Sequence, residues 1–320
     1  MAMLNEPLDP REIVSTAAFL RRGIKPSRLA AGKSPVLARV RAGEYLSTDR
    51  WVQLSAAERH RALIYATTAR MRSPLPMLYG VSAGIMLRLP IIGKIPQRVQ
   101  VLLDARAAGS STLVQRHRAM DLPGPMLIDG IPVTPPARTV VDLARTMSLA
   151  CALAAGDWAV RLSMCGVADI TNAALAVPCR GHGRAIAILA ARLVDPRSES
   201  PGESLSRARM YENGFPEPDL QVPLLDERGE FGRGDFGWPG LIGEFDGLRK
   251  YRATGDAGNM ASEEVVIREK RREDRARRAG WGFARWVWSD AFGGAGLTAT
   301  LLAGGLERSS THRWGRDIEN

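Results

Sequence analysis

The sequence is poor in the residues that mark disulfide-bonded or membrane proteins. It has three cysteines in 320 residues, Cys151, Cys165 and Cys179, whose odd number and wide spacing argue against a disulfide framework and a four-ligand zinc site. No apolar run approaches the roughly 20 residues of a membrane span, and the opening MAMLNEPLDPREIV lacks the apolar core of a signal peptide. We therefore expect a cytoplasmic protein with no membrane partner.

Histidine is also scarce, and several catalytic motifs are missing. The four histidines have no metal-ligand spacing, and the sequence contains neither His-Glu-x-x-His nor a Walker A phosphate loop. A Ser-His-Asp arrangement cannot be assembled from the sequence. These absences direct the search for chemistry to the acidic residues and to the distribution of charge.

Acidic residues are scarce in the first 200 positions. Residues 1–200 hold 26 Lys and Arg against 14 Asp and Glu, a net charge of +12, whereas residues 201–320 hold 18 against 20, a net charge of −2. A basic region favours nucleic acid, because Lys and Arg neutralise phosphates and release counterions. An arginine-rich surface is also what a GC-rich genome produces, and composition alone leaves both explanations open. DNA is the partner that this charge favours.

A chain of this length is expected to form two or three domains. The polar, proline-punctuated segment 195–202 is the best boundary in the sequence. We predict a winged helix-turn-helix in residues 1–47, a mixed α+β domain in 48–195, an α/β domain in 200–295 and a C-terminal tail in 296–320. The α/β domain follows the order α-β-β-β-α-β, read from GESLSRARMYENG, LQVPLL, GRGDFGW, LIGEFDG, EEVVIREKRREDRARRAGW and FARWVWSD, with a turn at ERGEFG.

The N-terminal segment has the pattern of short helices followed by a basic hairpin. Asp9-Pro10 with Glu12, and then Ser15, have the composition of helix N-termini, and VLARVRAGEYLS reads as strand, turn and strand. This pattern predicts a winged helix-turn-helix. The DNA contacts we then expect are a helix over 26–31 in the major groove and a wing on phosphate or the minor groove, with Ser27, Arg28 and Lys33 on the first and Arg39 and Arg41 on the second.

Two acidic residues in the C-terminal domain are placed to meet at one end of a sheet. Asp235 lies near the end of one predicted strand, and Glu244 lies nine residues later on the next, after a turn at 238–240. Converging carboxylates repel each other unless a cation lies between them, and Mg²⁺, or Mn²⁺ in its place, is the natural cation for such oxygen ligands. Glu203, at the start of the preceding helix, is a further candidate ligand, and Lys270 could supply positive charge to the reacting phosphate. Asp246 follows Glu244 closely. An acidic residue at a strand end is, taken alone, more often a solvated charge.

The ordered set of these pieces resembles the PD-(D/E)XK endonuclease superfamily, in particular the branch similar to very-short-patch-repair endonucleases. The matching pieces run through residues 200–290 in the order Glu203, Gln221, Asp235-Phe236, Glu244-Phe245-Asp246-Gly247, Lys270-Arg271, and then Gly280-Trp281 with Arg285. The resemblance implies a mixed sheet flanked by helices and metal-dependent cleavage of phosphodiester bonds, with Asp235 and Glu244 as metal ligands. The sequence departs from the pattern at one position, because the superfamily's Glu-x-Lys would place lysine where Asp246 stands. Lys270 or Lys250 would then carry the basic group, or the domain is an inactive copy.

Residues 13–46 resemble the winged-helix domain of AbiEi-type antitoxins, the DNA-binding partners of type IV toxin–antitoxin systems. The resemblance rests on IVSTAAFLRRGIKPSRLAAGK and LARVRAGEYL, and GIPVTPPARTVVDLAR is similar to a stretch that recurs in these proteins. It departs at the short first helix. The function expected is therefore a DNA-binding protein with a metal-dependent endonuclease-like domain, acting in defence or repair. The alternatives are a non-catalytic antitoxin-like transcriptional regulator with a degenerate nuclease fold, and a scaffold that binds a toxin protein.

Overall fold

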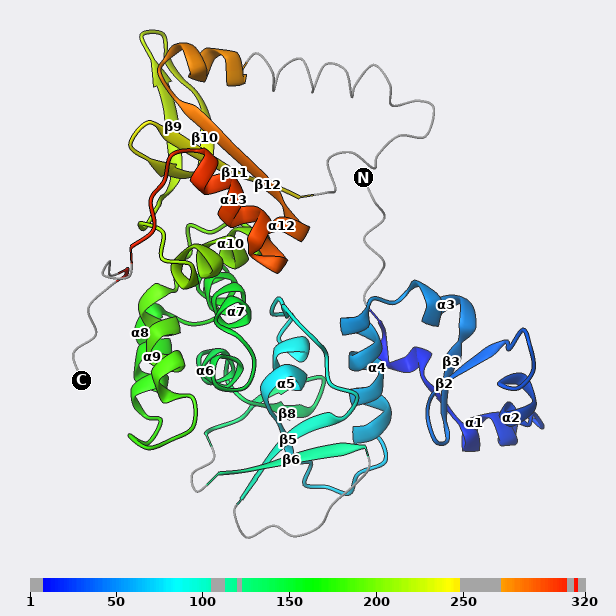
Figure 1. The fold of residues 1–320 in the computed structure, drawn as a ribbon. Helices are drawn as coiled ribbons and strands as arrows, with labels where there is room; N and C mark the ends of the chain where they lie inside the picture. Colours follow the sequence, from blue (N-terminus) through cyan, green and yellow to red (C-terminus); the bar gives the residue numbers. More distant parts are fainter. Residues whose placement is uncertain (1–7, 105–112, 120–122, 248–271, 310–313, 316–320) are drawn as a thin grey trace. The chain divides into compact units, whose positions relative to one another are not determined.

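The computed structural model describes residues 8–104, 113–119, 123–247, 272–309 and 314–315 (Figure 1). These residues form mixed α/β structure in which sheets are flanked by helices. Contacts divide the chain into an N-terminal unit, residues 3–146, and a C-terminal unit that contains residues 147–320. No helix in the described ranges is long and apolar enough to cross a membrane.

The N-terminal unit begins with a small antiparallel sheet in the order β1-β3-β2. Its elements are η1 (Pro10–Glu12), β1 (Val14–Ser15), α1 (Thr16–Arg21), α2 (Pro26–Leu29), β2 (Leu37–Arg41), β3 (Glu44–Ser47) and α3 (Thr48–Gln53). The predicted caps are confirmed: Asp9 and Glu12 form a capping box, and the Ser15 hydroxyl accepts the N–H of Ala18. The predicted helix over 26–31 is shorter than expected and ends at Leu29.

The rest of the N-terminal unit is a five-stranded mixed sheet with helices packed on it. The order is β6-β5-β4-β8-β7, with parallel β5–β6 and β4–β8 pairs and antiparallel β4–β5 and β7–β8 pairs. The elements are α4 (Ala56–Thr68), β4 (Met77–Leu78), α5 (Gly80–Met86), β5 (Val99–Asp104), β6 (Val114–Ala119), β7 (Met126–Ile128), β8 (Ile131–Val133) and α6 (Pro136–Thr146). Helix α5 is buried along its whole length, between α4, α6 and β5.

The C-terminal unit starts with helices, and its described residues continue in the predicted order α-β-β-β-α-β. Residues 263–271 of the predicted second helix lie outside the described residues. Its elements are α7 (Leu149–Arg161), α8 (Val167–Leu175), α9 (Arg184–Leu193), α10 (Pro201–Glu212), β9 (Asp219–Asp226), β10 (Gly229–Trp238), β11 (Leu241–Asp246), a helical segment 272–278, β12 (Gly282–Val287), α12 (Trp288–Gly293) and α13 (Ala295–Ala303). The sheet order is β12-β11-β10-β9, with β11 and β12 parallel and the other pairs antiparallel.

Each face of this sheet has its own apolar core. On one face Trp286 and Phe236 are buried, and the Trp286 indole donates to the Ser206 hydroxyl of α10 at 2.8 Å. On the other face Leu224 and Ile242 pack against Ala276 of the helical segment. The sheet is therefore covered on both sides, which explains its few exposed apolar side chains.

Three boundaries differ from the expected ones: one between units, one at the end of a strand and one at the C-terminal tail. The boundary between the units lies between residues 146 and 147, and segment 195–202 lies inside the C-terminal unit, where Ser200 caps α10. The last strand ends at Val287, and Trp288 begins α12. The expected tail from 296 contains most of α13, which contacts β12, and the buried Trp314.

Candidate functional site

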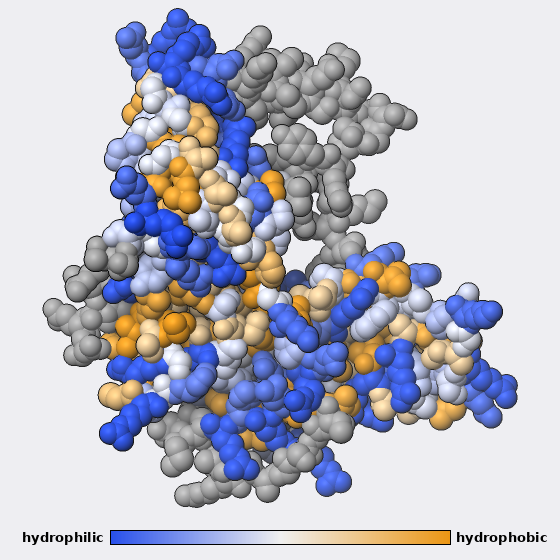
Figure 2. All heavy atoms as spheres, in the orientation of Figure 1, coloured by the Kyte–Doolittle hydropathy of each residue, from blue (hydrophilic) through white to orange (hydrophobic). Residues whose placement is uncertain are grey.

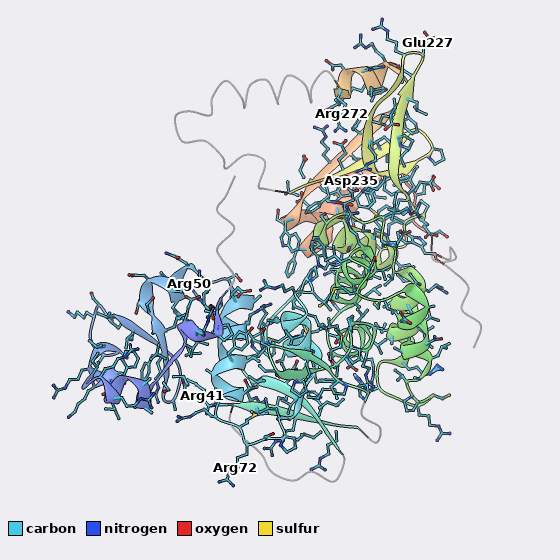
Figure 3. All side chains as sticks on the ribbon, turned by 180° about the vertical axis from the view of Figure 1, so that it is seen from behind. Arg41, Arg50, Arg72, Glu227, Asp235 and Arg272 are labelled. Atoms are coloured by element: carbon cyan, nitrogen blue, oxygen red, sulfur yellow. The ribbon has the colours of Figure 1, made fainter. Side chains whose placement is uncertain are left out.

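The two predicted carboxylates lie on adjacent strands. The antiparallel ladder pairs Phe236 with Gly243, and its register continued by one residue sets Asp235 of β10 opposite Glu244 of β11. Asp235 is labelled in Figure 3. Its Oδ2 accepts the backbone N–H of Phe245 at 2.8 Å. This carboxylate therefore accepts a strand N–H at the point where the regular ladder ends.

The glycines that precede the two acids make room for core side chains. A Cβ on Gly234 would lie 2.5 Å from Ile242 Cγ2, and one on Gly243 would lie 2.7 Å from the Trp286 ring. Both distances are far below van der Waals contact, so any larger residue would displace the core. These glycines allow the packing of the sheet that holds Asp235 and Glu244 in place.

Glu244 is buried between two arginines. Arg272 Nη2 donates to its Oε1 at 2.6 Å, and Arg285 Nη2 lies 2.9 Å from its Oε2. Arg285 is the neighbour of Glu244 in the parallel β11–β12 register, whereas Arg272 comes from the helical segment. The Glu244 side chain keeps 9% of its exposure. Two guanidinium groups thus balance the charge of this carboxylate, one on each oxygen.

The two arginines have further partners on the same face of the sheet. Arg272 Nη1 donates to the carbonyl of Arg233 at 3.0 Å, and Arg285 Nη1 lies 3.2 Å from Glu273 Oε2. Hydrophilic side chains also gather over the neighbouring hairpin tip and helical segment, where Asp226 binds Arg275 at 2.5 Å (Figure 2). Charged side chains of both signs therefore lie beside the candidate site on the helical side.

Glu203 opens α10 and has a separate set of partners. Its carboxylate accepts from the Ser200 hydroxyl at 2.7 Å, the Glu199 N–H at 2.8 Å and the Gln221 amide at 3.0 Å. Burial raises the pKa of Glu203. Gln221 reaches it from β9 with a backbone φ of +56°. None of these partners binds Glu244 in the described ranges, so Glu203 holds the start of α10 against β9.

The two remaining predicted residues take different positions. Asp246 ends β11, half-buried, beside Val287 in the parallel register. Lys270, and also Lys250, lie outside the described residues. Within the described ranges no three His, Cys, Asp or Glu side chains come together closely enough to hold a metal ion. The structure therefore does not join Glu203 or Asp246 to Asp235 and Glu244 as a third ligand.

The chemistry of the Asp235–Glu244 pair still fits a magnesium ion. Mg²⁺ is commonly held by one or two carboxylates, with water completing its octahedron, and both residues offer hard oxygen donors from opposed strand positions. For Glu244 to coordinate the ion, at least one of its oxygens must give up an arginine. A metal ion bound here would therefore compete with arginine for this carboxylate.

The predicted DNA-contacting residues differ in exposure. Ser27 and Arg28 are exposed on α2, Lys33 is exposed beyond the end of that helix, and Arg39 is exposed on β2. Arg41 is only half-exposed: burial and the neighbouring Arg70 lower its pKa. The four exposed residues are accessible to solvent, whereas Arg41 lies beside Glu44 and Arg70 at the turn between β2 and β3.

The pairing of Arg272 and Arg285 with Glu244 is visible only in the structure. Arg285 was part of the matched pattern and Arg272 part of a charged helix, but neither was assigned to this carboxylate. Their shared partner depends on the parallel pairing of β11 with β12 and on where the helical segment packs. Sequence spacing carries no signal for either, since the residues lie 28 and 41 positions after Glu244.

Comparison with known proteins gives two relatives. No family model and no solved structure matches the chain. It is similar to the uncharacterized proteins Rv2248 and MT2308 of Mycobacterium tuberculosis, strains ATCC 25618 / H37Rv and CDC 1551 / Oshkosh. Each is 30% identical over 187 residues, which make up 57% of this chain and 64% of the relative. The match therefore spans slightly less than two thirds of each relative's length.

Proposed function

We propose that this chain is a DNA-binding protein whose C-terminal unit contains a metal-dependent endonuclease-like site of the PD-(D/E)XK type. The observation that carries the proposal is the opposed position of Asp235 and Glu244 at the end of the β10–β11 ladder, with Arg272 and Arg285 beside them. The α-β-β-β-α-β order and the mixed sheet between helices support the same proposal.

The residues of the site have separate tasks in this proposal. Asp235 and Glu244 would hold Mg²⁺ or Mn²⁺, which when bound orients the phosphodiester and acidifies the attacking water. Arg272 and Arg285 offer guanidinium groups that match phosphate oxygens and stabilise the charge gained by the phosphorus centre. Hydrolysis adds the hydroxyl of water to phosphorus, and the leaving sugar oxygen takes a proton. The superfamily pattern has a lysine at the position of Asp246, and in this proposal Arg285 supplies the positive charge instead.

DNA binding is assigned to the N-terminal unit. Its first elements run β1-α1-α2-β2-β3 with the sheet order β1-β3-β2, an arrangement that supports a winged helix. Because α2 has only four residues, it offers one turn to a groove, and we assign most of the affinity to phosphate contacts by Arg28, Lys33 and Arg39. A helix of this length is shorter than the helix over 26–31 that was expected to enter the major groove.

A second candidate is an antitoxin-like transcriptional regulator whose nuclease-type domain is inactive. The observation that favours it is the pairing of both Glu244 oxygens with guanidinium groups, together with Asp246 in place of lysine. A carboxylate saturated in this way serves as a structural clamp between β11, β12 and the helical segment. In this alternative DNA binding remains, and a toxin protein is a further partner.

Plasmid cleavage distinguishes the two candidates. Supercoiled DNA is incubated with the full chain and Mg²⁺ or Mn²⁺, beside Asp235→Ala and Glu244→Gln. The matched control is Glu230→Gln, an exposed acid on the same strand as Asp235. The proposal expects nicking by the wild type and the control, and loss of nicking in both site variants. Tight, salt-sensitive DNA binding by all four proteins with no nicking by any would establish the regulator instead.

A further inference from the structure

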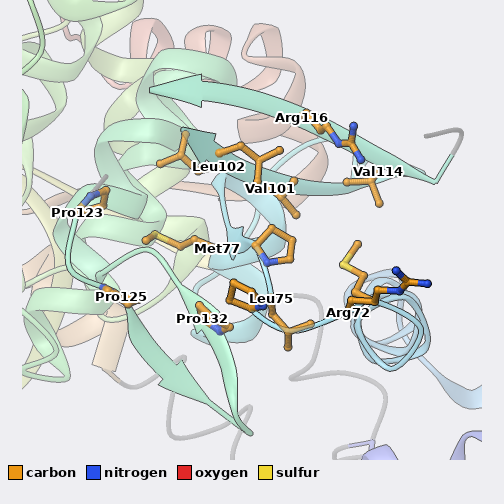
Figure 4. Close-up of a pocket in the computed structure, with 14 residues that line it drawn as sticks. Arg72, Leu75, Met77, Val101, Leu102, Val114, Arg116, Pro123, Pro125 and Pro132 are labelled. Carbon is orange, nitrogen blue, oxygen red and sulfur yellow. The ribbon is translucent and has the colours of Figure 1, made fainter. Parts of the chain in front are cut away.

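The N-terminal unit contains an apolar cavity of about 750 Å³ that the proposed function does not use (Figure 4). It lies over β4, β5 and β6 and is lined by aliphatic side chains, among them Leu75, Met77 and Val101. Its volume falls within the range of about 300–1,000 Å³ that is typical of small-molecule sites. The cavity is therefore large enough for a molecule and not merely for one or two waters.

Prolines make up much of the wall. Five of the fourteen lining residues are proline, namely Pro74, Pro76, Pro123, Pro125 and Pro132. Proline has no backbone N–H and a fixed φ angle, so this part of the wall offers neither hydrogen-bond donors nor much freedom to collapse. A wall of this kind suits the apolar body of a ligand, and any polar part of the ligand must find its donors elsewhere.

Two arginines supply those donors. Arg72 and Arg116 line the cavity and lie at the same end of it, whereas Pro123 and Pro125 lie at the opposite end (Figure 4). Guanidinium groups bind carboxylates with paired hydrogen bonds, and none of the described residues that line the cavity is acidic. The cavity thus has an apolar end and a cationic end.

We infer that this cavity binds a small amphiphilic anion, an organic carboxylate with an apolar chain or ring system. The apolar body lies against the prolines, Met77 and Val101, and the carboxylate is bound by Arg72 and Arg116. Such a ligand would contact β4, β5 and β6 together. None of the predicted DNA-contacting residues lines this cavity. The inference is independent of the nuclease-type site.

Calorimetric titration of the full chain with decanoate, below its micelle concentration, tests the inference. We expect saturable binding at one site per chain, and binding at least tenfold weaker for decyltrimethylammonium, which has the same chain but the opposite charge. Arg72→Gln combined with Arg116→Gln should weaken decanoate at least thirtyfold. Arg98→Gln, an exposed arginine of the same unit outside the cavity, is the matched control and should leave the affinity unchanged.

A second pair of variants tests the location. Leu75→Trp places a larger side chain in the cavity, whereas Leu127→Trp changes an exposed leucine that does not line it. The first should abolish binding and the second should preserve it, with circular dichroism confirming that both proteins are folded. Equal binding of the two amphiphiles, or unchanged decanoate affinity in either the double arginine variant or Leu75→Trp, would overturn the inference.

Discussion

Each unit of the chain contains a buried aspartate paired with arginine. The two pairs differ in how far apart the aspartate and the arginine lie in the sequence. In the N-terminal unit, Asp142 of α6 is bound by Arg138 at 2.9 Å and lies 3.6 Å from Arg145, one turn away on either side. In the C-terminal unit, Asp157 of α7 is bound by Arg207 of α10, fifty residues later, at 3.0 Å. Burial raises the pKa of each aspartate to about 6.

The arginines of the two pairs also differ in burial. Arg138 and Arg145 keep 28% and 21% of their side-chain exposure, because they lie on the surface of their own helix. Arg207 keeps 4%, since α7 and α10 enclose it, and it also donates to the Leu193 carbonyl at 2.6 Å. A local pair braces one helix, whereas the long-range pair joins several elements of a unit.

Charge separates the two units as clearly. Residues 3–146 hold 21 Lys and Arg against 10 Asp and Glu, a net charge of +11, whereas residues 147–320 hold 23 against 24, a net charge of −1. In the C-terminal unit arginines are matched to acids, as at Glu244 and Asp226. In the N-terminal unit the basic residues outnumber the acidic ones about two to one, so acids cannot balance all of them. The excess of positive charge therefore belongs to the N-terminal unit.

The largest effect is expected from breaking the buried pair of the C-terminal unit. Arg207→Met leaves Asp157 buried without its cation, which should lower the unfolding free energy of this unit by about 3–5 kcal/mol. Arg138→Met in the N-terminal unit should cost about 1 kcal/mol, because Arg145 remains and solvent reaches the site. Hydrogen exchange read on peptides of α7 and α6 measures both. Similar losses in the two units would contradict the distinction between a local and a long-range pair.

The pH dependence of stability should also differ between the units. A folded-state pKa raised above its unfolded value favours the fold below the unfolded pKa, and that stability is lost as pH rises through the folded value. Asp157 should therefore lower the unfolding free energy of the C-terminal unit by up to about 3 kcal/mol between pH 4 and 6. In the N-terminal unit the raised pKa of Asp142 has the same effect. Burial lowers the pKa of His60 to about 4, so the contribution of His60 to the unfolding free energy is lost as pH falls.

These opposite trends should nearly cancel in the N-terminal unit. Hydrogen exchange corrected for its intrinsic pH dependence should show a falling opening free energy in α7 and little change in α6 from pH 4 to 6. His60→Gln removes the contribution of His60, so the opening free energy of α6 should then also fall from pH 4 to 6. A flat profile in α7 of the wild type would contradict the assignment to Asp157.

Removal of an arginine at the candidate site should strengthen cation binding by about tenfold, or about 1.4 kcal/mol. Arg285→Gln removes one of the two guanidinium groups beside Glu244, with which a divalent ion would have to compete. Calorimetric titration with Mn²⁺ measures the change, and Arg278→Gln, an exposed arginine of the same unit, is the matched control. Glu244→Gln should abolish the uptake. Unchanged Mn²⁺ affinity in Arg285→Gln would show that arginine and metal do not compete.

The smallest effects are expected from single phosphate contacts on the N-terminal unit. Arg28→Gln and Arg39→Gln should each weaken DNA binding a few-fold and reduce the slope of log affinity against log salt by about 0.9. Fluorescence anisotropy with a duplex at several salt concentrations gives that slope. Arg278→Gln in the C-terminal unit should leave it unchanged. A larger effect of Arg278 than of Arg28 would move DNA binding to the other unit.

Local features of the fold were predictable from the sequence. The caps at Asp9 and Ser15, the β2–β3 hairpin and the order from α10 to β12 depend on contacts within a few residues, and the structure confirms them. The boundary between the units was not predictable. Segment 195–202 has the composition of a hinge, yet Asp157 accepts the Asp195 N–H and Arg207 binds Ser198, so this segment is held inside the unit.

The candidate site was predictable in part. The strand positions of Asp235 and Glu244 follow from alternation and turn residues, whereas the partners of Glu244 do not. In the structure Gly234 and Gly243 make room for Ile242 and Trp286. Which side chain fills such a space depends on how distant strands pack, and single-residue patterns do not record it.

The sequence by itself determined the order of elements from α10 to β12 and the basic charge of the N-terminal unit. The Arg138–Asp142–Arg145 brace is equally local, because its members lie within two turns of one helix. Only the tertiary structure decided that Glu244 lies between two arginines, that Arg207 closes on Asp157, and that five prolines and two arginines line one cavity. The physical reason is range: short-range geometry is set by backbone periodicity, whereas contacts across 28 to 50 residues depend on the packing of whole elements.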